Sequence, residues 1–233
     1  MLIEGFASPL TATNCFVVAP GIGEQCVIID PGYGVTGVLD DIVAEYRLHP
    51  VAVILTHGHL DHTFSVLPVC QARDVPAFIH ADDRSALADP WTGLGLTVGA
   101  PIFGVEGLTF AEPDDVRALQ DGASLELAGL SLTVRHAPGH TQGSVVFELA
   151  ATAGATADVA DGAGQDVLFS GDVLFAGSIG RTDLPGGSME SMLTSLRTVV
   201  LPMADEVIVC PGHGPQTTIG HERLTNPYLK ELL

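Results

Sequence analysis

Positive charge is the scarcest property of this sequence. The 233 residues contain 9 Lys and Arg against 28 Asp and Glu, which gives a formal net charge of −19 at pH 7. Lys230 is the single lysine of the chain. An acidic surface repels both the phosphate backbone of nucleic acids and anionic lipid headgroups. We therefore expect neither a nucleic-acid partner nor a membrane partner.

Cysteine is also scarce, and long apolar runs are absent. The four cysteines are scattered without a Cys-x-x-Cys pair, which favours buried thiols in a reducing compartment over disulfides or a zinc knuckle: Cys15, Cys26, Cys70 and Cys210. No stretch approaches the roughly 18 apolar residues of a membrane-spanning helix. Residues 1–14 lack the basic and apolar regions of a signal peptide. These features predict a cytoplasmic protein.

The rest of the composition is that of a globular protein with a large core. Hydrophobic residues make up 46% of the chain, and this length fits a single domain spanning residues 1–233. Residues 150–166 are low in complexity and lack large apolar side chains. We expect this segment to form a flexible surface loop.

Apolar runs of strand length alternate with segments of helical periodicity. Strands are expected at 15–19, 25–30, 51–55, 77–80, 124–127, 130–136, 143–149, 167–172 and 206–211. Helices are expected at 34–48, 63–73, 82–89, 188–203 and 221–233, the fourth capped by Ser188 and the last interrupted by Pro227. Residues 91–120 follow no clear pattern. This order predicts a layered α/β domain with sheet between helices.

Three of the nine histidines lie with one aspartate within six residues, directly after the apolar run 51–55. His57 and His59 are two residues apart, so an extended segment places them on one face whereas a helix would separate them. Asp61 continues this spacing, and His62 follows at the expected helix start. This position just beyond a buried strand is the crevice in which α/β sheets commonly bind ligands.

Three further residues of the same chemistry occur far along the chain. His140, Asp172 and His213 each lie near the end of an apolar strand and beside a glycine. Imidazole and carboxylate together suit zinc, iron or manganese. Seven such ligands are too many for one tetrahedral zinc, but they match two ions about 3.5–4 Å apart. The isolated histidines are expected to have ordinary structural roles: His49, His80 and His221.

The segments THGHLDH, APGHT, GD and PGHG resemble, in this order, the metal-binding motifs of the metallo-β-lactamase fold superfamily. The resemblance covers nearly the whole chain and implies an αββα sandwich of two mixed β-sheets flanked by helices. It also implies two divalent metal ions, with zinc as the first choice and iron or manganese as alternatives. The implied ligands are His57, His59 and His140 for the first metal, Asp61, His62 and His213 for the second, and Asp172 as the bridge.

Two longer segments, GDVLFAGSIGRTDLPGGS and GPQTTIGHERLTNPYL, look most like the glyoxalase II group, the hydroxyacylglutathione hydrolases. The resemblance implies a thioesterase in which Asp61 and Asp172 serve catalysis and a hydroxide attacks the thioester carbonyl. Arg181 falls where better-known members carry a substrate-binding lysine, although an internal ion pair with Asp183 is the alternative. His136 matches a position near the site and is expected to be structural.

The substrate is less well determined than the site. Longer glyoxalase II proteins hold glutathione with basic C-terminal residues, and here only Arg223 and Lys230 are available. The thiol carrier is therefore glutathione, mycothiol or another small thiol, bound by a monomer or a small homo-oligomer. The main alternative is a persulfide dioxygenase with one iron on His57, His140 and Asp172. An RNA-processing nuclease conflicts with the charge, and a non-catalytic binding protein conflicts with the complete ligand set.

Overall fold

The computed structural model of the protein describes residues 1–102, 104, 106–151 and 164–233. Most of the surface loop expected at 150–166 lies outside the described residues. At its base, the main-chain N–H of Ala151 donates a hydrogen bond to the carboxylate of Asp166. Among the described residues, no helix combines the length and the apolar character needed to cross a bilayer.

The first half of the chain forms a mixed sheet, here called the N-terminal sheet. In the described residues it contains six strands, in spatial order β1 (Leu2–Ala7), β2 (Asn14–Ala19), β3 (Gln25–Ile29), β4 (His49–Ile54), β5 (Ala77–His80) and β6 (Val116–Leu119). Strands β1 to β3 are antiparallel neighbours, whereas β3 to β6 are parallel. The parallel strands end at the same edge, so the loops that follow them lie together.

The second half forms the C-terminal sheet, also with six strands in the described residues. Their spatial order is β12 (Thr217–Thr218), β11 (Ile208–Pro211), β10 (Val167–Gly171), β9 (Val145–Leu149), β8 (Leu130–His136) and β7 (Ser124–Leu127). The pair β10–β11 is parallel and the other pairs are antiparallel. The expected turn at Ala128 and Gly129 joins β7 to β8, and both residues have positive φ angles, as a tight hairpin turn requires.

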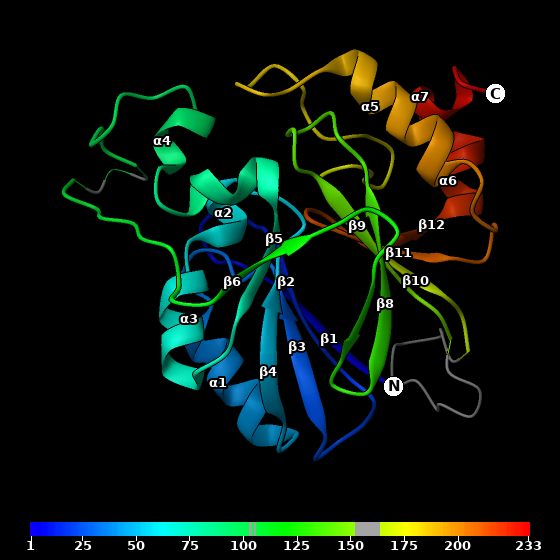
Figure 1. Cartoon of the computed structure of the whole chain (residues 1–233). Helices are drawn as coiled ribbons and strands as arrows, with labels where there is room; N and C mark the ends of the chain where they lie inside the picture. Colours follow the sequence, from blue (N-terminus) through cyan, green and yellow to red (C-terminus); the bar gives the residue numbers. More distant parts are fainter. Residues whose placement is uncertain (103, 105, 152–163) are drawn as a thin grey trace.

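Helices cover the outer face of each sheet (Figure 1). Those near the N-terminal sheet are α1 (Thr36–Glu45), α2 (Leu60–Thr63), α3 (Val66–Arg73), the 3₁₀ helix η1 (Ala81–Leu87) and α4 (Pro90–Gly93). Those on the C-terminal sheet are α5 (Met189–Ser195), its π-helical continuation η2 (Leu196–Val200), α6 (Ile219–Thr225) and α7 (Pro227–Lys230). The predicted αββα sandwich of two mixed sheets is confirmed.

The two-residue repeat of a strand explains how β2 serves two cores at once. Phe16 and Val18 point between the sheets, where the ring of Phe16 packs edge-on against Phe169 at 5.3 Å. Cys15 and Val17 point outward into the cluster beneath α1 and α3. Because both faces are covered, the strand is a continuous apolar run, and each fully buried large side chain contributes about 1.5–3 kcal/mol.

Several expected helices differ from those observed. The helix expected at 63–73 begins three residues later, as α3, because the Ser65 amide donates to the carbonyl of Pro31 and its hydroxyl donates to that of Gly32. The segment expected as a helix at 82–89 is the 3₁₀ helix η1. The helix expected at 34–48 is confined to α1. Strands β1, β6 and β12 and helices α2 and α4 were not predicted from the sequence. Four of these have four residues or fewer, and β1 lacks a clear apolar period.

Other expectations are confirmed. Ser188 caps α5, and its hydroxyl accepts a hydrogen bond from the amide of Ser191 at 3.2 Å. The C-terminal helix is interrupted before Pro227, where the side chain of Asn226 caps α7. All four cysteines are buried free thiols.

Candidate metal centre

The predicted ligands converge at one edge of the sandwich, although they come from both sheets. His57 lies in the loop after β4, and this loop leads into α2, which carries Asp61 and His62. His140 lies between β8 and β9, while Asp172 and His213 directly follow the neighbouring parallel strands β10 and β11. The carboxyl ends of these strands therefore face the loop that follows β4.

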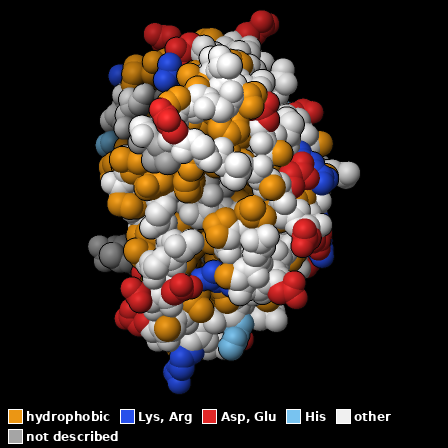
Figure 2. Space-filling view, turned by 90° about the vertical axis from the view of Figure 1, so that its left-hand side faces the viewer, with side chains coloured by type: hydrophobic (Ala, Val, Ile, Leu, Met, Phe, Trp, Pro, Cys, Tyr) orange, Lys and Arg blue, Asp and Glu red, His pale blue; other side chains and the backbone are white. Residues whose placement is uncertain are grey.

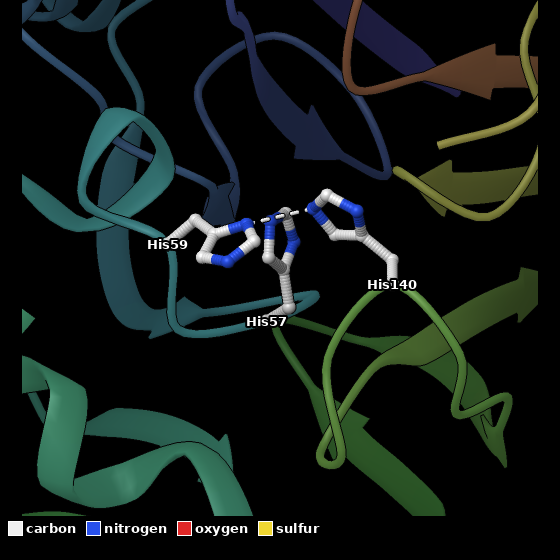
Figure 3. A group of neighbouring side chains, drawn as sticks. All are labelled: His57, His59 and His140. Carbon is white, nitrogen blue, oxygen red and sulfur yellow. Dashed lines mark hydrogen bonds between the residues drawn. The ribbon is translucent and has the colours of Figure 1, made fainter. Parts of the chain in front are cut away.

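His57, His59 and His140 form what we call the histidine group (Figure 3). Nδ1 of His59 lies 2.7 Å from Nε2 of His140. The ring of His57 is nearly perpendicular to both, with centroids 5.0 Å from His59 and 4.7 Å from His140. All three side chains are buried. Imidazole nitrogens of three different loop positions thus point toward a common space.

Asp61, His62 and His213 form a second cluster, which we call the mixed group. Oδ2 of Asp61 lies 3.1 Å from Nε2 of His213 and 3.5 Å from Nε2 of His62. The same oxygen accepts a hydrogen bond from the hydroxyl of Thr13 at 2.9 Å. The mixed group therefore combines two imidazoles with a carboxylate that Thr13, the residue before β2, helps to orient.

Asp172 lies between the two groups. Its Oδ2 is 3.4 Å from Nε2 of His140 in the histidine group and 3.6 Å from Nε2 of His213 in the mixed group. Its Oδ1 is 3.2 Å from Nε2 of His62. One carboxylate therefore contacts ligands of both groups, which is the position expected of a bridge.

Buried polar atoms without partners show that this donor set fits metal ions. Among the described residues, four buried atoms lack a hydrogen-bond partner of good geometry, although the last two lie 3.2 Å apart: Nε2 of His57, Nε2 of His59, Nε2 of His62 and Oδ1 of Asp172. Leaving such a group unsatisfied costs about 1–3 kcal/mol, so a cluster of four calls for another occupant. Nitrogen and oxygen donors of this kind bind zinc, iron or manganese.

The pKa values of the histidine group favour neutral rings. Burial, reinforced by the neighbouring imidazoles, lowers the pKa of His57 well below its usual value. Burial and the proximity of His140 lower the pKa of His59 to about 4. Because a neutral imidazole is the form that binds a metal, these two rings need not lose a proton first.

The mixed group has the opposite electrostatics. Burial lowers the pKa of His62, but the carboxylates of Asp61, Asp172 and Asp30 outweigh it and raise this pKa well above its usual value. Burial raises the pKa of Asp61, yet His62, His213 and Thr13 together bring it below the usual range. The pKa of Asp172 is also lowered, since His62 outweighs the effect of burial. Both acids are therefore carboxylates at neutral pH.

The main chain approaches this centre closely at Gly212, the residue before His213. A Cβ atom at this position would lie 2.7 Å from Cε1 of His62 and closer still to Oδ1 of Asp172. No side chain fits there without displacing a candidate ligand. The first glycine of the PGHG segment, Gly212, is therefore required because a larger residue would not fit at this position.

The family model named "Metallo-beta-lactamase superfamily" matches residues 9–213. The chain belongs to this superfamily. An uncharacterized protein of Mycobacterium tuberculosis is 44% identical, over 100% of this chain and 99% of the relative. The hydroxyacylglutathione hydrolase GloC of Haemophilus influenzae is 35% identical, over 95% of each chain. Among solved structures, the B3 metallo-beta-lactamase BLEG-1 superimposes with a TM-score of 0.79 and 35% identity, covering 97% of this chain and 99% of that one.

Asp30 was not identified from the sequence, where it was interpreted as the last residue of the strand expected at 25–30. Its carboxylate accepts hydrogen bonds from the amide of Thr56 at 2.8 Å and the hydroxyl of Thr56 at 2.6 Å. Its Oδ2 also lies 2.9 Å from Nδ1 of His62. A carboxylate on Nδ1 fixes the tautomer and leaves Nε2 of His62 available to a metal, as is usual around metal-binding histidines in proteins.

Asp83 was also missed, because nothing in the segment HADDRS separates it from its acidic neighbour. It is buried, and its carboxylate accepts hydrogen bonds from the amide of Gly58 at 2.8 Å, the hydroxyl of Thr141 at 2.6 Å and the amide of Gly143 at 2.8 Å. Gly58 lies between two ligands, and Thr141 follows a third. Asp83 therefore ties together the two loops of the histidine group.

Arg181 reaches the site through its main chain. Its carbonyl lies 2.8 Å from Nδ1 of His140 and accepts a hydrogen bond from that ring. Its guanidinium forms a two-pronged ion pair with Asp183, at 2.7 and 2.8 Å. The alternative of an ion pair with Asp183 is confirmed, but the pair is not buried, because the two side chains are 59% and 68% exposed.

The remaining histidines lie outside the two groups. The ring of His136 stacks on that of His80 at 4.3 Å and 7°, and its Nε2 donates to the carbonyl of Gln142. This contact places His136 near the loop of His140 without making it part of the histidine group. His49 and His221 are exposed.

Proposed function

We propose that the protein is a two-metal thioesterase of the glyoxalase II type, which hydrolyses thioesters formed between a 2-hydroxy acid and a small thiol. The observation that carries this proposal is the position of Asp172, whose carboxylate contacts both the histidine group and the mixed group. Similarity to GloC over almost the full chain supports the choice of thioesters.

In this proposal His57, His59 and His140 hold the first ion, and Asp61, His62 and His213 hold the second. Asp172 is shared, and its negative charge together with that of Asp61 offsets the repulsion between two dications. Bound divalent ions of this kind lower the pKa of a water molecule toward 7 and polarise a carbonyl. We assign Asp61 and Asp172 to catalysis, because these two carboxylates would hold the ions that activate that water.

The leaving group requires little help from the protein. A free thiol has a pKa near 8.5, so it departs as a thiolate without a dedicated general acid. Neither group contains a cysteine or lysine that would act as a nucleophile. The residues described above therefore suffice for direct hydrolysis.

The test combines metal analysis with turnover. We expect two equivalents of metal per chain, zinc first, with iron and manganese as the other candidates. We also expect hydrolysis of a lactoyl thioester, either of glutathione or of N-acetylcysteamine. Oxygen uptake with glutathione persulfide and one iron per chain would instead support the dioxygenase alternative. Turnover of a β-lactam without thioester hydrolysis would favour the activity named for BLEG-1.

A further inference from the structure

A cavity of about 250 Å³ adjoins the histidine group on the side of His59. Its wall includes Gly58 and His59 of the ligand loop, together with Gln142 and Gly186 from two loops of the C-terminal half. A Cβ atom added to Gly93, which also lines the cavity, would lie 4.0 Å from Cδ2 of His59. A substrate group that extends from the metal centre past His59 would therefore enter this cavity.

The charged residues of this wall are all acidic. They are Asp82, Asp83 and Asp89, and no lysine or arginine is found among the described residues that line the cavity. Asp82 is exposed and Asp89 is half-buried. The carboxylate of Asp89 accepts from the amide and the hydroxyl of Thr92 and so caps α4. Asp82 lies 3.6 Å from Nδ1 of His80, but burial, followed by the neighbouring His136, lowers the pKa of this imidazole, which therefore favours its uncharged form. Among the described residues, no lysine or arginine forms an ion pair with any of the three acids.

The cations of the chain do not compensate for these acids. Within the described residues, Arg181 is the one basic residue in hydrogen-bond contact with a candidate ligand, and that contact uses its carbonyl. Its guanidinium is already paired with Asp183. On the face shown in Figure 2, acidic side chains are spread around the edge and basic ones are sparse. Beyond the metal ions of the proposed function, an anionic group that enters the cavity therefore faces Asp82 and Asp89, with no lysine or arginine among the described lining residues.

We propose that the thiol half of the thioester substrate has no net negative charge. The enzyme therefore prefers thioesters of a neutral or cationic thiol to those of glutathione. This inference rests on the proposed thioesterase function and adds the charge class of its substrate. A glutathione thioester has two carboxylates and one ammonium group, which gives it a net charge of −1. Like charges repel within the cavity, whereas the hydroxyl of Ser85 and the side-chain amide of Gln142, which line it, can hydrogen-bond to uncharged groups.

A matched pair of substrates tests the charge directly. S-lactoylglutathione and its diethyl ester share the acyl group, the leaving sulfur and the peptide skeleton, but the ester lacks both carboxylates. We expect the metal-loaded enzyme to show a kcat/KM about tenfold higher for the diethyl ester. S-lactoyl-N-acetylcysteamine serves as a small neutral reference. Because salt screens charges that face solvent, the difference between the esterified and the free substrate should shrink as ionic strength rises.

Two variants locate the effect in the cavity. Asp82→Asn and Asp89→Asn each remove one negative charge, and asparagine at position 89 still caps a helix. Each should reduce the ratio of kcat/KM between the diethyl ester and the free glutathione thioester by about threefold. The matched control is Asp40→Asn, which removes an exposed acid paired with Arg73 on the distant helix α1. This control should leave the ratio unchanged.

The outcomes separate the inference from the function on which it rests. Equal or higher kcat/KM for free S-lactoylglutathione, or a ratio unaltered in both cavity variants, overturns the charge preference while the thioesterase stands. Absence of turnover with all three thioesters, in protein that holds two metal ions, overturns the thioesterase itself and the carrier inference with it.

Discussion

The histidine group and the mixed group each contain three candidate ligands, but the pKa values of their histidines are shifted in different directions. His57 and His59 are buried rings whose pKa values are lowered, so this side presents neutral nitrogens. In the mixed group, carboxylates outweigh burial and raise the pKa of His62. Binding a dication there must displace a proton, yet it also gains a negatively charged ligand, Asp61. The histidine group thus offers a cation neutral nitrogen atoms, whereas the mixed group offers it negative charge.

The hydrogen-bond partners that orient the ligand histidines also differ between the two groups, being uncharged in one and charged in the other. In the histidine group, Nδ1 of His57 lies 3.0 Å from the hydroxyl of Thr56, and Nδ1 of His140 donates to a main-chain carbonyl. In the mixed group, Nδ1 of His62 faces the carboxylate of Asp30. A charged partner makes an imidazole a stronger ligand than a neutral partner does. We therefore expect variants to affect metal content on one side at a time, except at Asp172.

Replacement of Asp172 should weaken metal binding in both groups at once. In Asp172→Ala both metals lose a shared negative ligand, so metal content should fall toward zero and turnover by about a thousandfold, or about 4 kcal/mol. Elemental analysis and steady-state kinetics with a lactoyl thioester measure both effects. Asp183→Ala is the control, because that aspartate is exposed and paired with Arg181. Two retained metals with near-normal turnover would show that Asp172 is not a bridge.

Single-group variants should separate the two sides. His213→Ala removes a ligand of the mixed group alone, so we expect one equivalent of metal to remain and turnover to fall about a hundredfold. His140→Ala should produce the reciprocal loss from the histidine group. Iron binding and oxygen uptake that survive His213→Ala but not His140→Ala would point to the dioxygenase. Equal loss of both metals in either variant would mean that the two groups do not bind independently.

Asp30 tests the contribution of the charged support. Asp30→Asn preserves the shape of the side chain but removes the charge facing His62. Metal affinity of the mixed group should fall about tenfold to a hundredfold, while the histidine group keeps its ion. Competition with a chelator, read as equivalents retained, measures this. An equal loss from both groups would contradict the separate roles assigned here.

Asp83 offers the corresponding test on the other side, where the effect is on stability. Asp83→Ala leaves the amides of Gly58 and Gly143 without their buried acceptor. Unsatisfied groups of this kind cost about 1–3 kcal/mol each, so we expect a loss of about 3 kcal/mol and a Tm lower by about 6–12 °C. Ser85→Ala, on the exposed face of the same 3₁₀ helix, is the control. An unchanged Tm would show that the loops are held by other contacts.

The sequence was sufficient for residues whose chemistry and strand position coincide. His57 and His59 follow a continuous apolar strand, and His140 and His213 follow others, so their convergence could be anticipated from the α/β pattern. Asp30 and Asp83 could not be found in this way. Their roles depend on hydrogen bonds to amides and hydroxyls 25 to 60 residues away, and a single aspartate in a turn looks the same with or without them.

Local structure was hardest to predict where tertiary contacts override helical propensity. The break between α2 and α3 arises from Ser65, which bonds to two carbonyls of the loop after β3. That loop is distant in sequence, so helical periodicity alone favoured a helix that starts already at residue 63. The same break positions His62 at the end of α2. A departure from the local pattern therefore coincides with the metal centre.

Arg181 should have the smallest effect, because its contribution to the histidine group comes from the main chain. Arg181→Ala keeps the carbonyl that accepts from His140, and it removes only an exposed guanidinium paired with Asp183. Exposed ion pairs contribute little to stability, so Tm and metal content should match the wild-type protein. We expect kcat/KM for S-lactoylglutathione to fall less than threefold, because Asp183 already neutralises this charge. A tenfold rise in KM for S-lactoylglutathione, absent for its diethyl ester, would show that the guanidinium leaves Asp183 to hold a substrate carboxylate.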